Sequence, residues 1–384
     1  AAILLLLVPA APAQTPPRTL GRPTAELAEP FTRVAGVREL RDGRVIVLDA
    51  QDQSIHLVDL RSGATAPIGR QGDGPGEFRL PLYLYSLPGD SSAVFDMVRP
   101  NGLLVITPDG KAGGIRPITG AEGGLVTRVN VDATDGVGRS YGKANIGRTL
   151  SGDSIEIVRL DPRSGRWEKV GMVCNKGISD LHPEWGCGRG AVPAAQPAGP
   201  VRMTGGPTPF ITTDQWAVAS DGRIAVVSAD PYRVTMISPN GAHQVGPVLP
   251  APPIRLTEAH KAVWLVDSRK PVATISSNGS GQSVTSYRPS RLPEPTEWPN
   301  RLPAFLMKAV TFSTDGTLWV QRTTADATAP PTYDLIGPVG TVLSRVVLPA
   351  RTRLVGFGTA TVYLMRIDED DLEYLQRYAL PTVR

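Results

Sequence analysis

Residues 37–69, VRELRDGRVIVLDAQDQSIHLVDLRSGATAPIG, contain the pattern that decides the fold. Short runs rich in β-branched residues alternate there with two turn dipeptides, Asp42-Gly43 and Ser62-Gly63. Runs of this length and composition, bounded by glycine turns, are typical of antiparallel strands joined by hairpins. We interpret the stretch as one unit of consecutive short strands.

The same plan recurs along the chain, which indicates a repeat architecture. The next unit, LYSLPGDSSAVFDMVRPNGLLVITPDGKAGGIRPI at 84–118, has turns at Gly89-Asp90 and Asp109-Gly110. Later units carry the turn pairs Asp135-Gly136 with Ser164-Gly165, Asp221-Gly222 with Asn240-Gly241, and Asp315-Gly316 with Val339-Gly340. A sixth unit, residues 353–380, ends after three strands.

The missing strand of the last unit predicts how the chain closes. A sheet that ends early leaves an unpaired edge, which is a template for aggregation. Residues 17–34, PRTLGRPTAELAEPFTRV, precede the first full unit and are expected to add the outer strand to the last sheet. The sequence therefore predicts an all-β protein, a single six-bladed β-propeller of four-stranded antiparallel blades whose N-terminal strand closes the last blade.

Three stretches carry a resemblance to known proteins: IGRQGDGPGEF at 68–78, ASDGRIAVVSADPYRV at 219–234 and VYLMRIDEDDLEYLQRYAL at 362–380. They resemble exported bacterial six-bladed β-propellers of the NHL-repeat and TolB-like kind. The resemblance implies a fold and no activity, because members of this group share none. From the residues themselves, the glycines of 68–78 fit a crossing between two blades, with Phe78 wedged between the sheets.

The N-terminus indicates export. Residues 1–14, AAILLLLVPAAPAQ, form an apolar stretch too short to cross a bilayer, followed by the small-x-small pattern of residues 11–13. We interpret 1–13 as the remnant of a secretory signal peptide and expect residues 14–384 to be a secreted or periplasmic monomer without a transmembrane segment. The net charge of +4 comes mostly from single arginines, so the sequence does not favour nucleic-acid binding.

Two stretches interrupt the repeat and are expected to be surface insertions. Residues 174–214 are rich in Gly and Pro, and residues 251–307 contain one short helical stretch, LTEAHKAVWLVD. The first holds both cysteines of the chain, Cys174 and Cys187, which we expect to pair in an exported protein and to contribute about 3 kcal/mol. A metal site with His182 is the alternative, but it lacks the CxxC spacing of zinc sites.

The sequence contains one match to a catalytic motif. Residues 138–142, GRSYG, satisfy the G-x-S-x-G pattern of a nucleophile elbow. An elbow needs a strand, a sharp turn and then a helix, whereas the residues after Ser140 continue toward another strand. We interpret the match as chance.

Candidate binding residues come from the loops that join the second and third strands of each blade, because those loops gather on one face of a propeller. The predicted ligand-binding residues are Asp96, Arg99, Tyr232, Arg233, Arg322 and Arg366, whose arginines could hold an anionic group. Candidate ligands for a metal such as Ca²⁺ are Asp49, Asp96, Asn145 and Asp230. The alternative is that these residues form local salt bridges, each worth at most about 1 kcal/mol.

The leading hypothesis is an exported binding scaffold that holds a protein, peptide, glycan or small ligand on its channel face, with no evident catalysis or cofactor. The alternative is a metal-dependent hydrolase or lyase of the lactonase type, in which a divalent cation over the channel polarises a carbonyl. A third hypothesis, a structural component of the cell envelope, predicts a large exposed apolar patch.

Overall fold

The computed structural model describes residues 17–99, 102–118, 128–145, 154–161, 165–174, 209–210, 213–277, 283–289 and 293–382. Strands dominate this part of the chain. The helical elements in it are a 3-10 turn, η1 (Pro88–Asp90), and one α-helix, α2 (Glu258–Ser268). The prediction of an all-β protein is therefore confirmed.

The first three blades follow one another along the chain, and each is an antiparallel sheet of four strands in sequence order. Blade 1 consists of β3 (Val34–Glu39), β4 (Val45–Asp49), β5 (Ser54–Asp59) and β6 (Ala64–Pro67). Blade 2 consists of β9 (Pro81–Ser86), β10 (Ser92–Asp96), β11 (Gly102–Ile106) and β12 (Ala112–Pro117). Blade 3 consists of β13 (Arg128–Thr134), β14 (Ser140–Asn145), β15 (Ser154–Leu160) and β16 (Trp167–Cys174).

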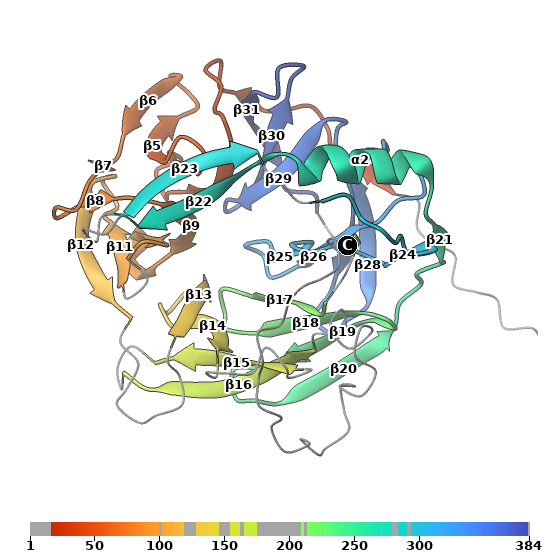
Figure 1. Cartoon of the computed structure of the whole chain (residues 1–384). Coiled ribbons are helices and arrows are strands. Elements are labelled where there is room, and N and C mark those ends of the chain that lie inside the picture. Colours follow the sequence, from red (N-terminus) through yellow and green to blue (C-terminus); the bar gives the residue numbers. More distant parts are fainter. Residues whose placement is uncertain are drawn as a thin grey trace, which may run out of the picture.

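The remaining three blades complete the ring seen in Figure 1. Blade 4 consists of β17 (Gln215–Val218), β18 (Ile224–Ala229), β19 (Tyr232–Ile237) and β20 (His243–Val248). Blade 5 consists of β25 (Val310–Phe312), β26 (Leu318–Arg322), β27 (Thr332–Ile336) and β28 (Val342–Val347). Blade 6 takes β29 (Thr352–Phe357), β30 (Thr361–Ile367) and β31 (Glu373–Ala379) from the end of the chain.

The N-terminal segment supplies the missing strand of blade 6, as the sequence predicts. β2 (Ala25–Glu26) pairs antiparallel with β31, with Ala25 opposite Arg377. The sequence did not predict a second contact, in which β1 (Arg18–Thr19) runs parallel to β28 and makes blade 5 five-stranded. Residues 18–26 are thus attached to the last two blades.

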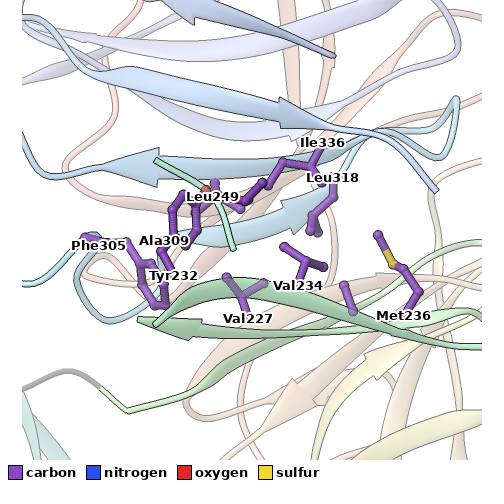
Figure 2. Close-up of a cluster of buried hydrophobic side chains, with 12 residues drawn as sticks. Val227, Tyr232, Val234, Met236, Leu249, Phe305, Ala309, Leu318 and Ile336 are labelled. Carbon is purple, nitrogen blue, oxygen red and sulfur yellow. The ribbon is translucent and has the colours of Figure 1, made fainter. Parts of the chain in front are cut away.

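Apolar residues fill every seam between neighbouring blades. The inner strands are buried on both faces, so side chains of opposite parity enter opposite seams. In β4, Val45 and Val47 pack in the seam with blade 6, whereas Ile46 and Leu48 pack in the seam with blade 2. Figure 2 shows the seam between blades 4 and 5, where Val227 and Val234 face Leu318 and Ile336.

Six such clusters account for six seams among the described residues, including the seam between blade 6 and blade 1. In that last seam Val47 of β4 packs in one cluster with Tyr363 and Leu375 of blade 6. The ring of sheets is therefore closed by packing as well as by strand pairing. The chain folds as a six-bladed β-propeller.

The segment 68–78 is a crossing between blades 1 and 2, as predicted. It contains a short parallel pair, β7 (Arg70–Gln71) and β8 (Glu77–Phe78). Phe78 is 2% exposed and packs in the seam cluster of these two blades. Gly76 has φ +75°, a conformation that residues other than glycine rarely adopt. It therefore permits the tight turn that places Phe78 between blades 1 and 2.

The elements between blades 4 and 5 belong to no blade. They are β21 (Ile254–Arg255), α2, β22 (Pro271–Ser277), β23 (Ser283–Pro289) and β24 (Arg301–Leu302). β21 pairs antiparallel with β24, and β22 pairs with β23 as a separate hairpin. Figure 1 shows α2 at the periphery of the molecule, near β21 and β24.

Candidate functional site

Several predicted site residues occupy the same position in their blades, at the end of the second strand. Asp49 ends β4, Asp96 ends β10, Asn145 ends β14 and Arg322 ends β26, while Asp230 directly follows β18. In three of these blades, the side chain at this position contacts the segment that precedes the blade's own first strand.

Asp49 and Asp96 bind the backbone of the preceding segment. The Asp49 carboxylate accepts hydrogen bonds from the N–H groups of residues 32 and 33 at 2.7 and 3.1 Å. The Asp96 carboxylate accepts from the N–H groups of residues 79 and 80 at 2.7 and 3.0 Å. Both side chains are buried, at 0% and 3% exposure. A cation bound here would have to displace these N–H donors, so each carboxylate serves as a clasp that holds the incoming segment against its own blade.

Burial affects the charge on Asp49. It raises the pKa of this carboxyl above its ordinary value, because the charged form loses water. The N–H groups of Asp52 and Thr32 act in the opposite direction, since they stabilise the carboxylate. The backbone N–H donors therefore offset part of the effect of burial on the pKa of Asp49.

Arg322 and Tyr232 lie together between blades 4 and 5. The guanidinium of Arg322 is stacked 4.3 Å from the ring centroid of Tyr232 and contacts the Asp334 carboxylate at 2.7 Å. Arg345 donates to the other oxygen of Asp334 at 2.8 Å. Burial, followed by the charge of Asp334, raises the pKa of Tyr232 above its ordinary value. The neighbouring Arg233 has a buried Nε without a hydrogen-bond partner among the described groups.

The remaining predicted ligand-binding residues hold other segments of the chain. Arg99 donates to the carbonyl oxygens of Glu77 and Gly72 at 3.1 and 3.0 Å, which fixes the 68–78 crossing. Arg366 donates to Glu26 at 2.8 Å and stacks 4.2 Å from the ring centroid of Tyr374. Among the described residues, no hydrogen bond, ion pair or ring contact joins Arg99, Arg366 and the Arg322 group to one another. A shared ligand site for the predicted set stays a prediction.

The structure describes some of the residues named in the metal and disulfide predictions. Among the described residues, no three His, Cys, Asp or Glu side chains come together as a metal site would require. Asp230 has an interaction partner, and Asn145 is placed only by its backbone. Cys174 ends β16, but Cys187 lies outside the described residues, as do residues 1–13. The disulfide and the signal peptide therefore stay predictions.

The G-x-S-x-G match does not have the geometry of a nucleophile elbow. Ser140 is the first residue of β14 and is 1% exposed. It pairs with Thr134 on one side and Leu160 on the other. A strand continues from it where an elbow needs a helix, which confirms the interpretation as chance.

A pocket that the sequence argument did not identify lies in the 251–307 insertion. It has a volume of about 640 Å³ and is lined by β21, the first turn of α2, residues 298–300 and β24. Its basic residues are Arg255, Lys261 and Arg301, and its acidic residue is Glu258. Pro253, Leu256, Trp298 and Pro299 form the apolar wall.

Contacts of His260 and Arg322 attach this pocket to the propeller. His260 of α2 is 6% exposed, and its Nε2 lies 3.1 Å from the carbonyl oxygen of Thr324 in blade 5. Arg322 donates to the carbonyl oxygens of Pro250 and Ala304, at the two ends of the insertion, at 3.3 and 3.0 Å. Arg322 thus holds both ends of the insertion that contains the pocket, while its role in ligand binding stays a prediction.

Aromatic packing positions the pocket wall. The rings of Trp298 and Trp264 of α2 pack edge to face, with their centroids 5.5 Å apart. The ring centroid of Phe210 lies 6.2 Å from that of Trp298. Such edge-to-face pairs stabilise a defined ring orientation. Lys261 lies 5.6 Å from the Trp298 ring centroid, which adds a cation–π contact.

The charges of the pocket are unbalanced. Arg255 and Arg301 are direct partners across the β21–β24 pair, and both are exposed. Like charges in directly opposite positions destabilise a sheet. Among the described residues neither arginine makes an ion pair, whereas Lys261 pairs with Glu258 at 2.7 Å. Two exposed arginines thus occupy opposite positions of one strand pair without a carboxylate partner among the described residues.

Comparison with known proteins gives likeness of fold only. No protein-family model and no curated protein sequence matches this chain. Regucalcin from Agrobacterium tumefaciens is similar at 11% identity and TM-score 0.43, covering 95% of this chain and 99% of its own. A gluconolactonase from Xanthomonas campestris is similar at 8% identity and TM-score 0.42, covering 97% and 98%. Virginiamycin B lyase from Staphylococcus aureus is similar at 11% identity and TM-score 0.39, covering 94% and 88%.

In the part of the chain that the structure describes, no helix has the length and apolar character needed to span a membrane.

The sequence signal for the pocket was weak. Arg255 and Arg301 are far apart along the chain, and only the two tryptophans of the insertion, Trp264 and Trp298, mark it as more than a polar excursion.

Proposed function

We propose that this protein is an exported β-propeller that binds a small anionic ligand in the pocket walled by Arg255, Arg301 and Trp298. The observation that carries the proposal is the pair of arginines directly opposite each other without a carboxylate partner among the described residues. Without a ligand this arrangement costs free energy, and with an anion it becomes favourable. The protein acts as a binding scaffold, and its site lies in the insertion beside blade 5.

The shape of the pocket supports the same proposal. Binding sites for small molecules combine an apolar wall with a few convergent polar groups, and their volumes are typically hundreds of Å³. This pocket, at about 640 Å³, has that size, and both apolar and charged side chains line it. Its attachment through His260 and Arg322 keeps the arginine pair in place before a ligand arrives.

The test is a titration of the protein with four small anions, measured by isothermal calorimetry at low salt. The anions are acetate, benzoate, phosphate and sulfate. We expect at least one anion to bind wild-type protein, and Arg255→Ala and Arg301→Ala each to weaken it at least tenfold. Arg269→Ala is the matched control, because Arg269 lies in the same insertion, pairs with Glu294 and does not line the pocket. Equal loss in the control variant, or no binding of any anion, would contradict the proposal.

Export is the second element of the proposal, and it rests on the apolar leader and the small-x-small pattern at 11–13. We expect a precursor that carries this leader to be processed to a chain that starts near Gln14 and to be recovered outside the cytoplasm. Intact mass of the recovered protein checks the cleavage point. Recovery of the uncleaved chain in the cytoplasmic fraction would contradict it.

A further inference from the structure

We infer that the pocket in the insertion takes a hydrophilic ligand that carries a doubly charged phosphate group, of the class of sugar phosphates. This inference rests on the proposed anion-binding function of the pocket. It deepens that function, because it names the charge of the anionic group and the character of the rest of the ligand.

The lining of the pocket carries a net positive charge of two. Among the described lining residues, Arg255, Lys261 and Arg301 are basic and Glu258 is acidic, so three positive charges stand against one negative charge. A singly charged ligand leaves one of the two excess charges uncompensated. A phosphate monoester carries nearly two negative charges at neutral pH and therefore compensates both.

The basic side chains have donors available for phosphate oxygens. The ammonium group of Lys261 has three N–H donors, and Glu258 accepts one of them at 2.7 Å. The Glu258 side chain is 87% exposed, so this ion pair contributes little by itself and Lys261 can also bind a ligand. The guanidinium groups of Arg255 and Arg301 have forked donors that match phosphate oxygens. Three basic side chains are thus present for the three terminal oxygens of a phosphate monoester.

The size and polarity of the pocket describe the rest of the ligand. Its volume of about 640 Å³ is in the range of sites for whole small molecules, so a phosphate group alone would fill only part of it. Polar atoms make up more of the exposed lining than apolar atoms do. An apolar body would take these polar groups out of water without giving them hydrogen-bond partners, which is costly. The lining therefore favours a body that carries hydroxyl groups.

The side chains of Asn300 and Trp298 fit such a body. The amide of Asn300 can both donate to and accept from a hydroxyl group. Trp298 gives the pocket one flat wall, and its contact with Trp264 holds the ring in place. A hydroxylated ring can lie against this wall while its hydroxyl groups bind the polar lining.

The experiment compares four probes on the folded protein by isothermal calorimetry at low salt and about pH 7.5. Glucose 6-phosphate is the test probe, and its methyl phosphodiester has the same body with a single negative charge. Phenyl phosphate has the same charge as the test probe on an apolar body, and glucose has no charge. We expect glucose 6-phosphate to bind about fivefold more tightly than either the diester or phenyl phosphate, and glucose to bind too weakly to measure.

Lys261→Gln tests the source of the charge preference. It lowers the net charge of the lining from two to one, so the preference for the monoester over the diester should fall to about twofold. Lys270→Gln is the matched control, because Lys270 pairs with Asp267 at 2.8 Å, also three residues away, and does not line the pocket. The control should keep the full preference. Melting curves and hydrogen exchange of the α2 amides check that both variants are folded.

The outcomes separate this inference from the proposed function. If the diester binds wild-type protein as tightly as glucose 6-phosphate, or if Lys261→Gln and Lys270→Gln lose the preference equally, the assignment of a doubly charged group is wrong and anion binding stands. If phenyl phosphate binds as tightly as glucose 6-phosphate, the assignment of a hydroxylated body is wrong. If none of these probes and no small anion binds, both the inference and the proposed function are wrong.

Discussion

The guanidinium of Arg322 contacts the carboxylate of Asp334 at 2.7 Å in the seam between blades 4 and 5, where the side chain of Asp334 is completely buried. Arg322 ends the second strand of blade 5 and also holds both ends of the insertion that forms the pocket. A residue predicted to bind ligand thus also holds the insertion in place. Its contact with Asp334 connects the stability of the ring to the geometry of the candidate site.

Replacing Asp334 is expected to destabilise the whole ring. Asp334→Ala leaves Arg322 and Arg345 without their shared carboxylate, and breaking a buried ion pair on one side costs about 3–5 kcal/mol. Thermal and urea unfolding measure the loss. Asp370→Ala, at an exposed position, should change stability by less than about 0.5 kcal/mol. Equal melting temperatures for the two variants would show that the pair contributes nothing.

The clasp at Asp96 is expected to be structural and independent of metal. Asp96→Ala removes the acceptor for the N–H groups of residues 79 and 80, and a buried unsatisfied donor costs about 1–3 kcal/mol. Asp49→Ala should have a similar effect, and the two losses should add, because the two clasps share no partner. Unfolding with EDTA and then with Ca²⁺ checks the metal prediction. A melting temperature that rises with Ca²⁺ in wild-type protein but not in Asp96→Ala would restore the metal hypothesis.

The attachment of the N-terminal strand is expected to weaken in acid. Arg366 and Gln376 donate to the Glu26 carboxylate, and the Arg366 hydrogen bond holds the pKa of Glu26 below its ordinary value of 4.5. A lowered pKa in the folded state stabilises the protein above the ordinary pKa, and this contribution is lost as the pH falls through the folded value. Because the pair is exposed, the contribution should stay below about 1 kcal/mol.

The measurement for this strand is a difference between two melting temperatures. Glu26→Gln should melt below wild-type protein at pH 7, and this deficit should shrink at pH 3, because the lowered pKa of Glu26 stabilises the folded state only while its carboxylate is charged. Glu29→Gln, in the same N-terminal segment, is the control and should show no pH-dependent difference. A Glu26→Gln deficit of equal size at both pH values would contradict the role of charge.

Detaching α2 is expected to disable the pocket with little effect on the blades. His260→Ala removes the contact with the Thr324 carbonyl oxygen and the side chain that completes the cap at Thr257. Hydrogen exchange of the α2 amides should accelerate, and anion binding should weaken at least tenfold, because the pocket is no longer preorganised. His243→Ala, at an exposed position on β20, should change neither quantity. Unchanged exchange in His260→Ala would show that α2 is held by other contacts.

The blades could be predicted from the sequence because their signals are local. Residues that alternate by parity along β4 fill two different seams, and turns such as Asp42-Gly43 recur at the hairpins. The absence of a fourth strand in the last repeat predicted the pairing of Ala25 with Arg377. The parallel contact of Arg18 with Val346 could not be predicted, because a two-residue strand has no periodicity to recognise.

The candidate site is built from residues that are far apart along the sequence and come together only in the folded protein. By itself, the sequence determined the strand repeat, the closing segment and the presence of polar residues at the ends of the second strands, because period-two burial and glycine turns act over a few residues. Only the tertiary structure decided that Asp49 and Asp96 bind backbone N–H groups and that Arg255 stands opposite Arg301. The reason is physical: the path of an insertion has no repeat, so the neighbours of its side chains are set by packing on the finished propeller.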